Sequence, residues 1–168
     1  MFEDTMKIKD EVSFGVGKNF EDGITLKGLM VAKLYGPEGL KDVREVSNLV
    51  TTLGKIMAAD QILAAPAVVT PGWMEVGTGT GQGAGSSILA LYIAGSRTAL
   101  DSKTRGANSI ITMVCTLAAG VGTGAITEAG VFNVVTQNTT DLIVYADFAA
   151  INKLAADSLV ITWTLTFA

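Results

Sequence analysis

The chain has 168 residues, a length that suits one hydrophobic core with an appended segment and is too short for two ordinary domains. Its formal net charge is −4, with no histidine and a single cysteine, Cys115. These numbers argue against a protein that coats nucleic acid, and they exclude Ser-His-Asp and Cys-His catalytic sites and any disulfide within the chain. Without histidine, zinc also loses its usual ligands, and we expect neither a metal nor a cofactor.

Charged side chains are concentrated at the start of the chain. Residues 1–60 hold 18 of the 28 charged residues, so the other 108 positions carry 10, far below the roughly 25% of a typical soluble domain. Two interpretations are open. The exposed faces of a β domain carry Thr, Ser, Asn and Gly instead, or the surface is covered by copies of the same chain or by a protein lattice.

Residues 1–25 show no sustained hydrophobic period. They lack the apolar core of a secretory signal peptide, so we expect a chain made in the cytoplasm and not secreted. The segment is either a solvated tail or an extended arm that becomes ordered on a neighbouring subunit. Three large apolar side chains fit the arm, and we take Phe2, Phe14 and Phe20 as the candidate partner-binding residues.

A hairpin and a helix are predicted next. Residues 29–46 contain two strand patterns around the turn Gly36-Pro37-Glu38-Gly39. Apolar residues at three- and four-residue spacing then predict an amphipathic helix at 48–63, capped by Ser47 or Asn48. Such a helix can bind a membrane or a partner helix, but we expect it to pack across the open end of its own β-sandwich.

A short strand at residues 73–76 leads into a glycine-rich loop at 77–85. Residues 79–84 match the G-x-G-x-x-A part of a dinucleotide-binding fingerprint, which also requires a βαβ unit and an acidic residue about twenty positions on. Another strand pattern follows instead. We therefore expect a flexible surface loop, since glycines at alternate positions form no rigid element without outside support.

Strands are predicted at residues 97–100 and 109–117. In the second, Ile111, Met113, Cys115 and Leu117 share one face. The other face is also partly apolar, as in a central strand or one covered by another subunit. Cys115 is then a small core side chain. The uncharged run at residues 106–127 is long enough for a membrane helix, but its threonines and glycines favour a strand and a loop.

The last strand pattern is the clearest. Leu159, Ile161, Trp163 and Leu165 alternate with Val160 and then with threonines, which indicates one buried face with Trp163 in the core. We expect residues 141–148 to be its antiparallel hairpin partner. Upstream, Glu128 has no second acid beside it, so we expect a buried hydrogen-bond acceptor and not half of a paired-carboxylate site.

The same C-terminal residues carry a resemblance to a known group of proteins. The matching sequences are ITEAGVFN (126–133), INK (151–153), DSL (157–159) and ITWTLTF (161–167), with upstream likeness at 49–63, 74–80 and 97–104. They resemble small virion accessory proteins of tailed bacteriophages, which occur on heads and on tails. The likeness covers residues 26–168 and leaves residues 1–25 unmatched.

The strand patterns and this resemblance imply a mainly β fold. We expect one antiparallel, jelly-roll-like β-sandwich at residues 26–168, with one short amphipathic helix and an extended N-terminal arm at 1–25. The resemblance implies a non-enzymatic capsid decoration or cement protein in the virion. Its partners would be the major capsid protein and copies of itself, as a homotrimer, with no nucleic acid and no membrane. The alternative is a tail fibre or baseplate module that recognises a host surface glycan.

Overall fold

The computed structural model describes residues 26–107 and 109–168, so Phe2, Phe14 and Phe20 lie outside the described residues. This part of the chain contains one helix and ten strands. In chain order the elements are β1 (Leu26–Gly36), β2 (Gly39–Ser47), β3 (Leu49–Val50), α1 (Thr52–Asp60), β4 (Trp73–Gly77), β5 (Thr98–Ala99), β6 (Ser102–Arg105), β7 (Ile110–Leu117), β8 (Gly124–Phe132), β9 (Leu142–Lys153) and β10 (Ser158–Phe167).

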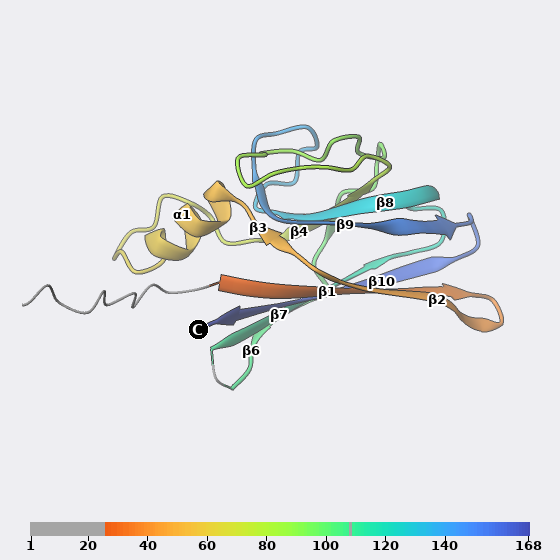
Figure 1. Ribbon diagram of the computed structural model, residues 1–168, viewed down its shortest axis with the longest axis horizontal. Coiled ribbons are helices and arrows are strands. Elements are labelled where there is room, and N and C mark those ends of the chain that lie inside the picture. Colours follow the sequence, from red (N-terminus) through yellow and green to blue (C-terminus); the bar gives the residue numbers. More distant parts are fainter. Residues whose placement is uncertain (1–25, 108) are drawn as a thin grey trace, which may run out of the picture.

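The strands form two sheets that stack face to face (Figure 1). The first sheet has the order β2-β1-β10-β7-β6, and the second has the order β3-β9-β8-β4-β5. The named strand pairs are all antiparallel. The predicted fold class, an antiparallel β-sandwich with one short helix, is confirmed.

The helix is shorter than the predicted span of residues 48–63. Its N-cap is Thr51, whose hydroxyl accepts a hydrogen bond from the Gly54 N–H at 3.1 Å. Leu49 and Val50 form β3 instead, paired with Tyr145 and Val144 of β9. The chain leaves β2 in the first sheet and joins the second sheet within a few residues, and this pairing holds Leu49 and Val50 in an extended conformation.

The predicted hairpin between residues 141–148 and the last strand is wrong. β9 lies in the second sheet between β3 and β8, whereas β10 lies in the first sheet between β1 and β7. The turn at residues 154–157 therefore carries the chain from one sheet to the other. β10 pairs instead with β1 along its length, from Leu26 opposite Phe167 to Tyr35 opposite Ser158.

The core lies between the two sheets. Trp163 is fully buried together with Ile161, as the alternation in this strand predicts. Its indole N–H donates to the sulfur of Met74 in β4 at 3.3 Å, which joins the two sheets through the core. Cys115 is also buried, and burial, helped by the charge of Asp101, raises the pKa of its thiol to about 12.

Among the described residues, no helix has both the length and the apolar character that a membrane span requires.

Candidate binding surface at the helix end of the sandwich

The carboxylate of Glu128 organises the glycine-rich loop. Glu128 is fully buried in β8 and accepts three backbone N–H bonds, from Gly79 at 3.0 Å, Ala90 at 3.0 Å and Leu91 at 2.7 Å. A Cβ atom at Gly79 would lie 2.7 Å from Oε1 of Glu128, so this close approach requires glycine. Glu128 is thus a buried acceptor, as the sequence predicts. It also holds the start of the glycine-rich loop in place, although the glycine spacing predicts a flexible loop.

A second buried polar group surrounds Arg97. Its guanidinium pairs with Glu75 and, at 3.0 Å, with Asp141, and it lies 3.7 Å from the ring centre of Phe132. Burial raises the pKa of Glu75 in spite of the Arg97 charge beside it. Two neighbouring carboxylates can carry acid–base chemistry. Here the carboxylates of Glu75 and Asp141 both face Arg97 and are nearly inaccessible to solvent. This cluster therefore holds loops against β4 and leaves no carboxylate open to a substrate.

In the part of the chain that the structure describes, no group of three or more His, Cys, Asp or Glu side chains is placed to hold a metal ion.

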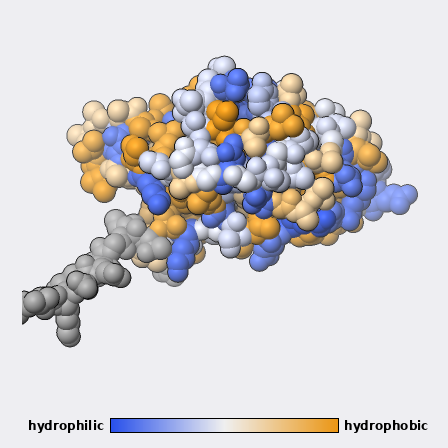
Figure 2. All heavy atoms as spheres, turned by 45° about the horizontal axis from the view of Figure 1, so that its top comes forward, coloured by the Kyte–Doolittle hydropathy of each residue, from blue (hydrophilic) through white to orange (hydrophobic). Residues whose placement is uncertain are grey.

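Exposed apolar side chains gather on α1 and on the connection that follows it. Four of them form what we call the apolar shoulder, with exposed fractions of 51% for Ile56, 81% for Ile62, 59% for Leu63 and 66% for Val69. Figure 2 shows hydrophobic atoms at the same end of the molecule, on the left. Such a cluster is typical of a surface that another molecule covers.

Two side chains hold the connection after α1 in shape. The carboxylate of Asp60 accepts a hydrogen bond from the Val68 N–H at 2.6 Å, and the Gln61 amide donates to the Val68 carbonyl at 3.0 Å. Both bonds close the loop that carries Ile62 and Leu63. The shoulder is therefore presented by an organised loop.

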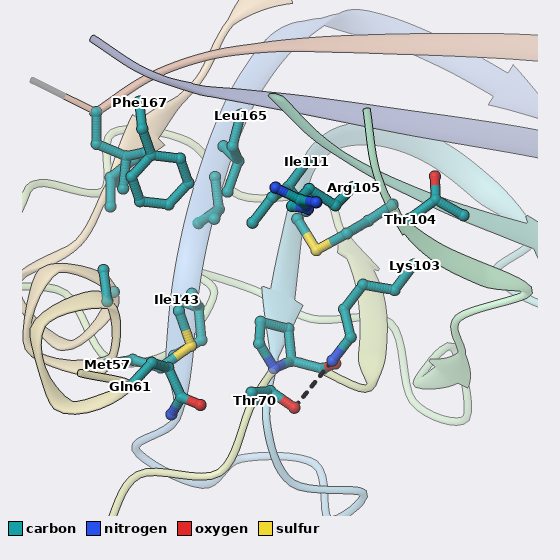
Figure 3. Close-up of a pocket in the computed structure, with 17 residues that line it drawn as sticks. Met57, Gln61, Thr70, Lys103, Thr104, Arg105, Ile111, Ile143, Leu165 and Phe167 are labelled. Atoms are coloured by element: carbon teal, nitrogen blue, oxygen red, sulfur yellow. Dashed lines mark hydrogen bonds between the residues drawn. The ribbon is translucent and has the colours of Figure 1, made fainter. Parts of the chain in front are cut away.

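Beside the shoulder, an apolar cavity of about 450 Å³ opens between α1 and the adjacent ends of both sheets (Figure 3). This volume lies within the roughly 300–1,000 Å³ of typical ligand pockets. Its walls include Leu26, Met57, Ile111, Met113, Leu165 and Phe167. Because these residues come from α1 and from three strands, the cavity is the incompletely filled end of the sandwich core.

Two cationic side chains of β6 line the rim of this cavity. The ammonium group of Lys103 donates to the Thr70 hydroxyl and to the Pro71 carbonyl, each at 2.9 Å (Figure 3). Partial loss of hydration lowers the pKa of this group, although the residue as a whole is exposed. Arg105 is exposed and takes part in none of the ion pairs between described residues. The cavity therefore combines an apolar interior with a positively charged edge.

The rest of the surface carries few charges. Ten charged residues follow Asp60, and six of their side chains are buried: Glu75, Arg97, Glu128, Asp141, Lys153 and Asp157. The four exposed ones are Asp101, Lys103, Arg105 and Asp147. Half of these exposed charges thus lie at the rim of the apolar cavity.

The predicted binding residues Phe2, Phe14 and Phe20 lie outside the part of the chain that the structure describes. Our sequence reasoning missed the shoulder and the cavity. The signal for the shoulder was present, because residues 61–72 carry no charge and include Ile62, Leu63 and Val69. The cavity had no comparable local signal, since its walls come from distant segments.

Comparison of the chain with protein-family models, curated proteins and solved structures gave no match.

Proposed function

We propose that this chain is a non-enzymatic structural protein of a phage virion, which decorates or cements the head. It would bind the major capsid protein and copies of itself. The observation that carries the proposal is the apolar shoulder, because Ile62 and Leu63 are strongly exposed on an organised loop. The resemblance of the C-terminal sequence to virion accessory proteins of tailed bacteriophages supports the same function.

Binding alone would supply this function. Apolar side chains gain about 25 cal/mol per Å² when a partner covers them. Only four exposed charged side chains follow Asp60, so few charges would lose their hydration when this surface is covered. Many copies on a repeating lattice would add modest individual contacts through multivalency.

A tail fibre or baseplate module that recognises a host glycan has less support. Glycan recognition would favour exposed aromatic rings with a polar edge, which suit contacts that are partly apolar and partly hydrated. Among the described residues, Tyr92 is the only aromatic side chain in the set of exposed large apolar residues.

The test is binding to heads purified without this protein from the phage that encodes it. Ile62→Asp combined with Leu63→Asp places two charges on the shoulder, where both side chains are already exposed, so the fold should persist. We expect the affinity for heads to fall at least tenfold, because covering each apolar side chain contributes about 1.5–3 kcal/mol. Occupancy is measured by co-sedimentation with the heads.

Leu154→Asp is the matched control. Leu154 is 60% exposed, but it follows the opposite end of β9 from α1. This variant should bind heads as the wild type does. Equal binding by the shoulder variant and the control would reject the shoulder as the capsid-binding surface.

A further inference from the structure

A three-residue sequence occurs twice in the first 25 residues. Phe2-Glu3-Asp4 and Phe20-Glu21-Asp22 each place two carboxylates directly after an aromatic ring. Phe14 differs, because Gly15 and Val16 follow it. The two copies therefore combine one large apolar group with local negative charge, whereas Phe14 supplies the apolar group alone.

The cavity at the helix end has the complementary chemistry. Met57, Met113 and Leu165 form apolar walls, which suit an aromatic ring. Lys103 and Arg105 stand at the rim, where carboxylates next to the ring would meet positive charge. Arg105 forms no ion pair with another described residue, so its guanidinium is available for a carboxylate.

The short stretch of chain before the cavity favours the second copy, Phe20-Glu21-Asp22, as its occupant. Leu26, the first described residue, itself lines the cavity. Phe20 is six residues earlier, within about 20 Å of extended chain. Gly23 lies between them and allows the chain to turn back. A tether this short gives the segment a high effective concentration at the cavity of its own chain.

We propose that Phe20-Glu21-Asp22 docks in the apolar cavity of its own chain, with the ring of Phe20 among Met57, Met113 and Leu165. The carboxylates of Glu21 and Asp22 face Lys103 and Arg105. Docking completes the end of the core that α1 leaves open. The proposal concerns the free protein and is independent of the capsid, so it can fail or succeed without the proposed function.

Methionine methyl signals of the full-length protein test this docking by nuclear magnetic resonance. An aromatic ring shifts the signals of methyl groups beside it, and Met57 and Met113 line the cavity, whereas Met30 and Met74 are buried elsewhere in the core. Phe20→Ser should shift the signals of Met57 and Met113 and leave those of Met30 and Met74 in place. Unchanged Met57 and Met113 signals would overturn the proposal.

Phe14→Ser is the matched control for the ring, because it makes the same change in a sequence that lacks the two acids. It should leave the four methyl signals in their wild-type positions. If it shifts Met57 and Met113 as Phe20→Ser does, the effect is not specific to Phe20-Glu21-Asp22 and the proposal is wrong.

A charge exchange tests the rim. Arg105→Glu should shift Met57 and Met113 in the same direction as Phe20→Ser, because like charges repel the segment. Adding Glu21→Arg to this variant should restore the wild-type signals. Wild-type signals in Arg105→Glu alone, or no recovery in the double variant, would reject the assigned charge contacts.

Mixing two forms of the protein distinguishes the chain's own segment from that of a second copy. Labelled Phe20→Ser protein is incubated with an excess of unlabelled wild-type protein. The labelled signals should stay shifted, since each chain fills its own cavity. Recovery of wild-type signals would show that the segment comes from another copy and would overturn the proposal.

Discussion

A single buried carboxylate, that of Glu128, holds several backbone groups far from it in sequence. It accepts N–H bonds from Gly79, Ala90 and Leu91, which belong to both sides of the loop between β4 and β5. Thr127 adds a hydrogen bond from its hydroxyl to the Gly79 carbonyl at 2.8 Å. The carboxylate thus accepts hydrogen bonds from backbone N–H groups that would otherwise need ordered water as a partner.

Glu128→Gln should destabilise the protein although the two side chains have nearly the same shape. The amide offers one acceptor oxygen, and its NH₂ group would face a backbone N–H, so at least one buried donor loses its partner. Such a loss costs about 1–3 kcal/mol. Urea unfolding measures the change, with the exposed Glu45→Gln as a control that should stay within about 0.5 kcal/mol. Equal stability of both variants would contradict this role.

At the scale of elements, α1 is fastened to the second sheet by its first turn. Thr51 donates a hydrogen bond from its hydroxyl to the Leu142 carbonyl at 2.6 Å, and its N–H bonds to the Ile143 carbonyl at 3.1 Å. Gly54 then passes close to β9. The glycine is a weak position for helix propensity, and the structure gives the reason for it: the helix backbone lies against the sheet backbone.

Gly54→Ala should therefore destabilise the protein, although alanine favours an isolated helix by about 1 kcal/mol over glycine. The added Cβ would lie 2.3 Å from the Ile143 carbonyl oxygen, and relief requires backbone movement. Overpacking of this kind costs about 1–3 kcal/mol, and urea unfolding detects it. Gly72→Ala, where a Cβ meets nothing within 4 Å, is the control. A gain in stability for Gly54→Ala would show that α1 can move away from β9.

An ion pair connects β2 to the turn between β9 and β10. Lys41 lies 2.8 Å from the buried carboxylate of Asp157, which also accepts the Leu154 N–H at 2.9 Å. The hydrogen bond from Lys41, followed by that from Leu154, holds the pKa of Asp157 below its ordinary value of 3.8. This turn carries the chain between the sheets, so the charge of Asp157 stabilises a crossing point of the fold.

Stability should depend on this charge at low pH. Because the folded-state pKa is lowered, the contribution is fully present above the ordinary value of 3.8 and is lost as the pH falls through the lower pKa of the folded protein. Asp157→Asn should lower the urea midpoint near neutral pH and flatten its fall below the ordinary pKa of 3.8. Lys41→Gln should weaken the same dependence. A profile for Asp157→Asn parallel to that of the wild type would contradict the assignment.

For the whole molecule, the uneven distribution of charge is the main feature of the surface. The exposed charges after Asp60 are only Asp101, Lys103, Arg105 and Asp147. The outer face of β7 is partly apolar as well, with Ile110 and Val114 half-buried. A surface of this kind has little charge to oppose contact between copies of the chain.

We therefore expect the free protein to associate, and we propose a trimer as the assembled form. Sedimentation equilibrium over a range of concentrations measures the mass of the particle directly. The shoulder variant with Ile62→Asp and Leu63→Asp tests whether the same surface joins the copies. A wild-type protein that stays monomeric at tens of micromolar would contradict self-association in solution.

Features that depend on side-chain periodicity could be predicted from the amino-acid order. The alternation of Leu159, Ile161, Trp163 and Leu165 specifies which face of β10 is buried, because neighbouring side chains in a strand always point to opposite sides. The isolated position of Glu128 likewise indicated a buried acceptor. These predictions need no knowledge of which segment lies beside the strand.

Strand partners, helix limits and the cavity were decided by tertiary structure. Backbone hydrogen bonds between strands are the same for every sequence, so nothing local distinguished β1 from β9 as the partner of β10. Pairing with β9 likewise makes Leu49 and Val50 a strand, although the spacing of apolar residues there predicts a helix. The cavity exists only because Met57, Ile111 and Leu165 converge at one end of the sandwich, and this depends on how the two sheets and α1 pack together.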